Sequence, residues 1–229
     1  MKKNNTPAQT QVDETEIAGN PSRRRFFQLA GGIAGAGLLV ASCRRTPPST
    51  TYVGAGDIGL LNYLYILKQV TVAMYTQAIA TPYYGITLSE TELQVDLRDQ
   101  ELVHREFLKK LLGRDAVKEI TTNLSLITFA DKKSFLTHAS ILEDLSVGAM
   151  NGAIKVMSST DYMLTISKIC SVDARHAGYI REVWKHNTFA DGTILDANGL
   201  DRAVAPVVGF ATLENYIETK FDISKLPTF

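Results

Sequence analysis

The sequence has no excess of charge of either sign, because 24 lysines and arginines balance 24 aspartates and glutamates. Residues 1–42 hold five of the basic and three of the acidic residues, so the remainder carries 19 against 21 and a net charge of −2. Proteins that bind nucleic acid present a dense basic surface. The balance therefore excludes nucleic acid as the expected partner.

Cysteine is also scarce, with only Cys43 and Cys170 in 229 residues. Two cysteines can form one disulfide in an oxidising compartment, but Cys43 ends a weakly apolar N-terminal run and is expected to be used there. Cys170 is therefore expected to be a free thiol that packs as a small apolar side chain. Strand-like alternation of useful length is lacking as well, which argues against a β-sheet protein.

The first 43 residues have the pattern of an export signal. Arg23 and Arg24 precede a weakly apolar run of about a dozen residues, 29–41, which is too short to span a bilayer. Paired arginines in this setting are typical of a twin-arginine signal. The run ends in Val-Ala-Ser-Cys43, which resembles a lipid-attachment motif. We predict a signal peptide at 1–43, a tether at 44–56, and a periplasmic or envelope protein held to the membrane by a lipid on Cys43.

Two alternatives remain for this segment. It could be an uncleaved anchor, or it could direct ordinary secretion with Cys43 incidental. Twin-arginine export carries folded proteins, a route often used when a metal or cofactor is inserted in the cytoplasm.

Helical periodicity dominates from Asp57 onward and predicts helices at 57–80, 89–112, 131–157 and 160–186. Asp57 is expected to cap the first helix, and Ser89 with Glu92 to form a capping box on the second. A linker at 114–130 separates the second and third. Residues 187–229 are expected to be an irregular extension with one short helix near 211–221. Four amphipathic helices at 57–186 predict an all-α, antiparallel four-helix bundle.

Each apolar stripe is interrupted by polar residues near its middle. A buried charge is costly unless it is paired or binds a metal ion, so four interruptions at similar depth predict a polar centre in the bundle. The interrupting residues are Lys68 in the first helix, Glu101 and His104 in the second, Glu143 in the third, and Asp173 and His176 in the fourth.

The spacing of these residues suggests metal binding. Glu101 and His104 are three residues apart, as are Asp173 and His176, so each pair lies on one helix face within reach of one cation. Carboxylate and imidazole ligands together suit iron, manganese or zinc. His138 has no such acidic partner, and it is expected to be an ordinary surface or helix-end residue, as is His186.

On these motifs, residues 57–186 resemble the exported ferritin-like domain family that includes the desiccation-related proteins. The matching stretches are Leu61-Asn62-Tyr63, Ala73-Met74-Tyr75, Arg98-Asp99-Gln100-Glu101-Leu102-Val103-His104, Leu142-Glu143-Asp144 and Val172-Asp173-Ala174-Arg175-His176-Ala177. The resemblance implies a ferritin-like bundle with a long connection between its second and third helices. It also implies a two-metal centre with Tyr75 next to the metal ligands.

One departure from the family pattern changes the expected centre. The family has a glutamate seven residues before the tyrosine that corresponds to Tyr75, where this chain has Lys68. Thr71 likewise stands at a position that is commonly acidic in the family. A milder change is Asp173, where glutamate is more usual. Three carboxylates and a lysine carry −2, which one divalent ion neutralises and two would overcompensate. We therefore expect at most one ion, bound either by Glu101, His104 and Glu143 or by Asp173, His176 and Glu143.

Two functions remain open from the sequence. In the first, a degenerate two-metal site with Glu101, His104, Glu143, Asp173 and His176 holds one divalent ion (iron, manganese or zinc) or none, with Lys68 replacing the second. The protein then has a metal- or oxidant-related role in the envelope, and classical di-iron oxygen chemistry is disfavoured. In the second, it is a metal-free, non-catalytic stress or interaction protein on the same scaffold.

Overall fold

Four long helices make up most of the part that the computed structural model describes, residues 50–229. The predicted all-α bundle is confirmed, and the boundaries of its four long helices all lie within two residues of their expected positions. The proposed signal peptide, with Arg23, Arg24 and Cys43, lies outside the described residues, as do residues 44–49 of the tether. The helices are α2 (Gly56–Ala80), α3 (Leu88–Leu112), α4 (Lys132–Val156) and α5 (Thr160–Trp184).

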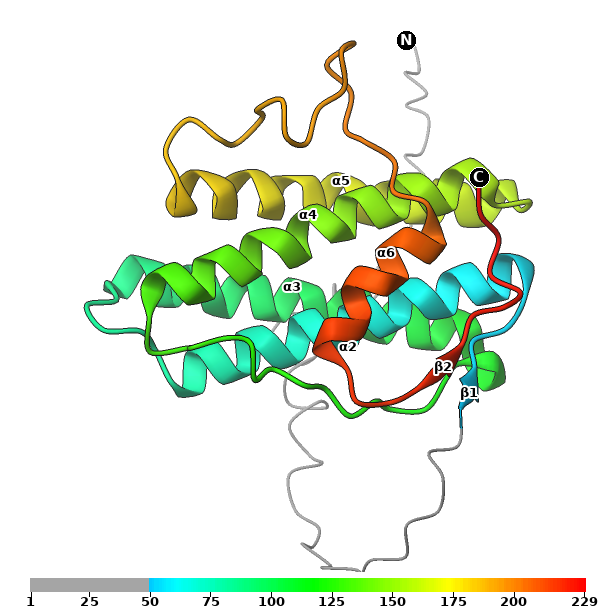
Figure 1. Cartoon of the computed structure of the whole chain (residues 1–229), viewed down its shortest axis with the longest axis horizontal. Coiled ribbons are helices and arrows are strands. Elements are labelled where there is room, and N and C mark those ends of the chain that lie inside the picture. The colour runs from blue at the N-terminus through cyan, green and yellow to red at the C-terminus, as the bar shows by residue number, and fades with distance from the viewer. Residues whose placement is uncertain (1–49) are drawn as a thin grey trace, which may run out of the picture. The chain divides into compact units, whose positions relative to one another are not determined.

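The connection between α3 and α4 has the predicted ferritin-like topology. Helices α2 and α3 pack as one antiparallel pair, α4 and α5 as another, and α2 also packs on α4. Residues 113–131, which begin with the short turn η2 (Gly113–Asp115), run along the whole bundle before α4 begins (Figure 1). Helix α4 therefore starts at the opposite end from the end of α3, which excludes a tight hairpin between them.

Buried polar side chains of α2 hold this long connection in place. Asn62 donates from Nδ2 to the Asp115 carbonyl at 2.8 Å and accepts from the Val117 backbone N–H at 2.9 Å. Gln69 accepts from the Ile120 backbone N–H at 3.0 Å. The connection thus satisfies its backbone groups against α2, which becomes the most deeply buried helix of the bundle.

Both predicted helix caps are wrong in detail. Ala55, not Asp57, is the N-cap of α2, and Asp57 instead accepts from the backbone N–H groups of Ser158 and Ser159, each at 2.8 Å. It therefore ties the start of α2 to the turn between α4 and α5. The capping box of α3 is formed by Thr87 and Glu90, because this helix begins one residue earlier than expected.

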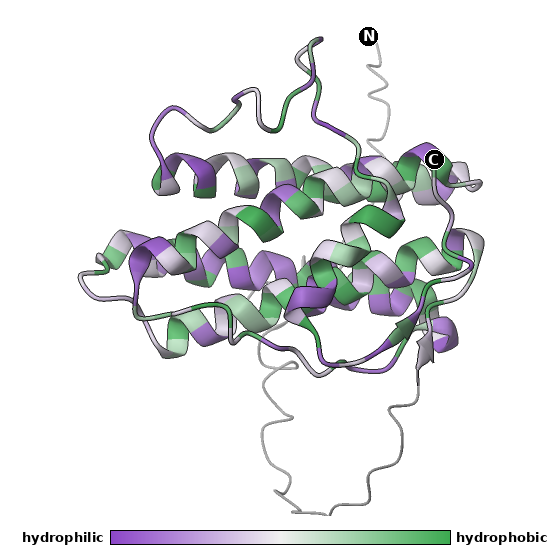
Figure 2. Ribbon diagram, viewed as in Figure 1, coloured by the Kyte–Doolittle hydropathy of each residue, from purple (hydrophilic) through white to green (hydrophobic). Residues whose placement is uncertain are grey.

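The C-terminal extension packs on the bundle. Its helix α6 (Pro206–Leu213) lies earlier than the expected 211–221 and begins with a proline, whose fixed φ suits a first helical residue. Helix α6 is largely apolar (Figure 2) and contacts α4 and α2. The turn η3 (Glu214–Tyr216) follows, and strand β2 (Phe221–Asp222) pairs in parallel with β1 (Thr51–Tyr52).

Close approach to α4 fixes the chain before α6. The Val204 backbone N–H donates to the Gly148 carbonyl at 2.8 Å, and a Cβ at Gly152 would lie 1.8 Å from the Val204 carbonyl oxygen. Only glycine fits at that point of α4. Within residues 50–229, no helix is both long and apolar enough to cross a membrane.

Candidate metal centre

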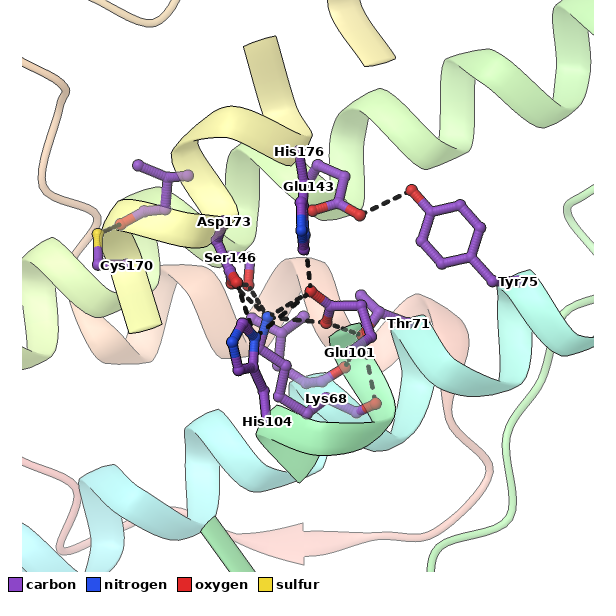
Figure 3. Close-up of polar contacts among 12 residues, drawn as sticks. Lys68, Thr71, Tyr75, Glu101, His104, Glu143, Ser146, Cys170, Asp173 and His176 are labelled. Atoms are coloured by element: carbon purple, nitrogen blue, oxygen red, sulfur yellow. Dashed lines mark hydrogen bonds and ion pairs between the residues drawn. The ribbon is translucent and has the colours of Figure 1, made fainter. Parts of the chain in front are cut away.

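All six polar residues singled out from the sequence meet at the centre of the bundle (Figure 3). Each helix contributes at least one, because the residues lie on the inward stripes and the four helices cross at similar depth. Four of them are 0% exposed, and only the two imidazoles, at 8%, reach the edge of the centre. The structure thus brings Lys68, Glu101, His104, Glu143, Asp173 and His176 together; that they bind a metal ion stays a prediction.

Lys68 is the hub of the cluster. Its ammonium donates to both oxygens of Glu101, at 3.0 and 2.7 Å, to Asp173 Oδ2, and to Ser146 Oγ at 2.9 Å. Burial by itself would lower the pKa of Lys68, but the carboxylates of Asp173 and Glu101 outweigh burial and raise that pKa above its usual value. Lys68 is therefore a permanent cation in the centre.

Glu101 and Asp173 are held ionised by this cation. Burial disfavours their charged forms, yet Lys68 keeps the pKa of both carboxyls below the usual range. Each also accepts a hydroxyl hydrogen bond, from Thr71 Oγ1 to Glu101 Oε2 at 2.7 Å and from Ser146 Oγ to Asp173 Oδ2 at 2.7 Å. The sequence reasoning missed Ser146, although it lies one turn after Glu143 on the same helix face.

Glu143 has no such cation within hydrogen-bonding distance. Burial and the charge of Glu101 raise its pKa well above the usual range, which favours the protonated form of this carboxyl. Tyr75 donates to Glu143 Oε1 at 2.7 Å, while Oε2 is buried with no hydrogen-bond partner among the described residues. Tyr75 thus lies beside the centre, where the family resemblance placed it.

The two imidazoles each lie against one carboxylate. His176 Nδ1 is 3.2 Å from Glu101 Oε1. His104 Nδ1 is 3.1 Å from Asp173 Oδ1, but the two atoms are not aligned for a hydrogen bond, and both lack a partner within residues 50–229. The rings are stacked, with their centroids 6.3 Å apart.

Two groups of three residues have the ligand spacing of a metal site, Glu101–His104–Asp173 and Glu101–Glu143–His176. Neither expected grouping is correct: Asp173 takes the place expected for Glu143 beside His104, and Glu101 takes the place expected for Asp173 beside His176. Asp173 of α5 reaches across to His104 of α3, and Glu101 of α3 reaches across to His176 of α5. Glu101 therefore belongs to both groups, which the spacing within single helices did not reveal.

The donor atoms fit a metal ion better in the second group. Lys68 already bonds to both carboxylates of the first group, so a cation there would lie beside an ammonium. The second group shares Glu101 with the first, but it adds the His176 imidazole and Glu143, whose Oε2 has no hydrogen-bond partner among the described residues. These are the ligand types that divalent transition metals prefer.

The remaining predictions fall outside this centre. Cys170 is buried and has no disulfide partner among the described residues, and burial raises its pKa to about 11. His186 is exposed, as expected, and pairs with Glu182. His138 is only partly exposed, because its Nδ1 lies 2.8 Å from the Tyr216 hydroxyl of the C-terminal extension.

Comparison with known families agrees with this geometry. The family model described as a ferritin-like domain matches residues 56–186, which is more than half of the chain and covers all four long helices. No curated protein matches the chain.

Proposed function

The chain belongs to the ferritin-like domain family, and on this premise we propose that it binds one divalent metal ion at Glu101, Glu143 and His176. Lys68 would occupy the place of a second ion. The observation that carries this proposal is the contact of the buried Lys68 ammonium with both Glu101 and Asp173.

The charge of the centre supports a single ion. With Glu143 ionised, three carboxylates and Lys68 sum to −2, and one divalent cation brings the buried centre to zero. A second would leave it at +2, which is costly in a site that excludes water. The raised pKa of Glu143 favours a proton on this carboxyl before the ion binds, and that proton would reduce the charge to −1.

The residues define what the bound ion would do. Carboxylate and imidazole ligands suit iron, manganese or zinc, and such an ion would supply Lewis-acid or one-electron chemistry. Chemistry that needs two bridged metals does not fit, because Lys68 holds both carboxylates between which the second ion would lie. Tyr75 would orient Glu143 as a ligand through its hydrogen bond.

The cellular setting belongs to the same proposal. A twin-arginine signal and a lipid on Cys43 would place this metal centre in the cell envelope, in a metal- or oxidant-related role. Replacing Arg23 and Arg24 with lysine should retain the precursor in the cytoplasm, since that export route reads the guanidinium pair and not charge alone. Cys43→Ala should preserve export and abolish lipid labelling. If the wild type carries no lipid and Cys43→Ala fractionates as the wild type does, simple secretion would replace the anchor.

A second candidate function is a metal-free envelope protein with a stress or interaction role. The observation that favours it is that Lys68 already neutralises Glu101 and Asp173 without any metal, and that Glu143 can remain neutral by holding a proton. The bundle could therefore be stable as a scaffold alone.

Elemental analysis of the purified full chain separates the two. We expect one equivalent of iron, manganese or zinc per chain, with His176→Gln losing it. The matched control is His138→Gln, which lies outside the centre and should keep the ion. Two equivalents would refute the role of Lys68. No bound ion, even after dialysis against each metal, would establish the metal-free alternative.

A further inference from the structure

Outside the metal centre, a cavity lies under an arch that we define as residues 189–204. In Figure 1 the arch is the gold-to-orange segment that stands above α4 and α5 before α6 begins. It lies beyond the residues that match the family, 56–186. Residues outside the family match therefore form one side of the cavity, and α4 and α5 form the other.

The arch is fixed at its first end by Arg181 of α5. The buried guanidinium donates from Nε to the Thr188 carbonyl at 2.6 Å, from Nη2 to Asp191 and Thr193 at 3.0 and 2.7 Å, and from Nη1 to Asp144 at 2.6 Å. Four such bonds from one buried side chain hold the start of the arch rigidly against α4 and α5.

The other end and the middle are fixed as well. The Val204 backbone N–H donates to Gly148 of α4 at 2.8 Å, and the Arg202 backbone N–H donates across the arch to the Ile194 carbonyl at 3.0 Å. The Arg202 side chain donates to the carbonyls of Leu195 and Gly192, at 3.1 and 2.9 Å. These bonds fix the position of the arch, so the cavity under it is part of the folded structure.

The cavity has a volume of about 750 Å³ and a predominantly apolar lining. Small-molecule sites in proteins commonly measure ~300–1,000 Å³ and are lined in this way. Large apolar side chains remain exposed around it: Phe189 is 63% and Val208 61% exposed. Covering this apolar surface would be favourable. The apolar side chains that line it include Ile141, Leu145, Ala177, Phe189, Ile194 and Val208.

The charged residues that line the cavity do not favour binding of a charged ligand. Two acidic and two basic residues line it, so the lining carries no net charge. Asp144 pairs with Arg181 through Oδ2, although its buried Oδ1 has no hydrogen-bond partner among the described residues. The Arg202 guanidinium is held by two carbonyls, and Asp201 is exposed. An ion entering the cavity would lose water without finding an unpaired buried counter-charge.

We propose that this cavity binds one neutral, apolar small molecule. It shares a wall with the metal centre without opening into it. Ala174 and Ala177 line the cavity, and their chain neighbours Asp173 and His176 face the centre, since successive residues of a helix point about 100° apart. The proposal does not depend on metal binding.

Gly178 of α5 provides a selective test. It lines the cavity, and a Cβ there would meet only the Phe189 carbonyl oxygen, at an ordinary 3.8 Å. A leucine side chain at this position would extend into the cavity, and leucine has a higher helix propensity than glycine. Gly178→Leu should therefore fill the site without unfolding the protein, and Gly178→Ala is the matched control with little added volume.

The experiment titrates the full chain with N-phenyl-1-naphthylamine, a neutral apolar dye whose fluorescence rises in apolar surroundings. We expect saturable binding of one dye per chain, weakened at least ~10-fold by Gly178→Leu and changed less than ~3-fold by Gly178→Ala. Ile194→Asp, in the arch, should also weaken binding by burying a charge. Thermal unfolding should show Gly178→Leu to be no less stable than the wild type.

Competition identifies the class of ligand. Decan-1-ol should displace the dye, whereas decanoate and decylammonium should need at least ~10-fold higher concentrations. Unsaturable dye binding, or equal binding by the wild type and Gly178→Leu, would overturn the proposal. Equal displacement by either ion would overturn the assignment of a neutral ligand. Self-association of the chain that Gly178→Leu abolishes would assign the cavity to a second copy instead.

Discussion

Lys68 donates a hydrogen bond to each carboxylate oxygen of Glu101, at 3.0 and 2.7 Å, and both side chains are fully buried. A carboxylate bound through both oxygens to an ammonium has few lone pairs left for a metal ion. Glu101 is nevertheless shared by both candidate ligand groups. The affinity and stoichiometry of metal binding therefore depend on Lys68.

Lys68→Met should destabilise the metal-free protein by ~3–5 kcal/mol, because it leaves Glu101 and Asp173 buried without their cation. Zinc or manganese should recover much of this loss, since the ion binds the folded state. Denaturant unfolding with and without metal measures both effects. The matched control is Lys109→Met, whose exposed pair with Glu119 should contribute no more than ~0.5 kcal/mol. Equal losses in the two variants would show that the buried pair adds nothing net.

Lys68→Glu should raise the stoichiometry from one towards two divalent ions per chain. The substitution gives four carboxylates and two imidazoles, whose charge of −4 two divalent ions neutralise. Elemental analysis and titration with manganese measure the number of sites. A single site in the variant would show that some feature other than Lys68, such as the shorter Asp173 side chain, limits binding.

The proton on Glu143 links metal binding and stability to pH. The pKa of Glu143 is raised in the folded state, so its contribution to stability is present below its unfolded pKa of ~4.3 and is lost as pH rises. From about pH 5 upward, the free energy of unfolding of the metal-free protein should fall by as much as ~1.4 kcal/mol per pH unit. The decline should end where Glu143 ionises.

Metal affinity should change in the opposite direction, rising up to ~10-fold per pH unit, because the ion displaces the Glu143 proton. Calorimetry in buffers of different ionisation enthalpy counts that proton. Glu143→Gln removes the titrating group, and the pH-dependent component of stability assigned to it should vanish. The same pH slope in the wild type and in Glu143→Gln would assign the effect to another group.

The sequence predicted the bundle and its polar centre because both depend on local patterns. Apolar periodicity marks each helix, and a charge on an apolar stripe, such as Lys68 or Glu143, must face the interior wherever the neighbouring helices lie. Depth along each helix could be compared directly from residue number. These features needed no knowledge of how the helices are rotated about their axes.

Pairings across helices could not be predicted in this way. Whether Asp173 lies nearer to His104 or to His176 depends on the offset and rotation of α3 against α5, which tertiary packing sets. Nothing in the sequence marks Ser146 as part of the centre, because serine is common in helices. The arch has no periodicity, and its path follows from single contacts such as Val204 on Gly148.

Tyr75 and Tyr63 provide a matched pair for testing the surroundings of the metal. Both are fully buried in α2, but the Tyr75 hydroxyl donates to Glu143 at 2.7 Å, whereas the Tyr63 hydroxyl has no hydrogen-bond partner among the described residues. Tyr75→Phe should weaken metal binding by ~10–100-fold, because Glu143 loses the bond that orients it.

Tyr75→Phe should also cost ~1–3 kcal/mol of stability, since a buried oxygen of Glu143 loses its donor. Tyr63→Phe should leave metal affinity unchanged, and stability equal or slightly higher, because it removes a buried hydroxyl that was never satisfied. Isothermal titration with zinc and denaturant unfolding of both variants measure these differences. A similar loss of affinity in both would mean that bulk packing in α2 governs the site. No loss in Tyr75→Phe would mean that Glu143 is not a metal ligand, or that it needs no orienting bond.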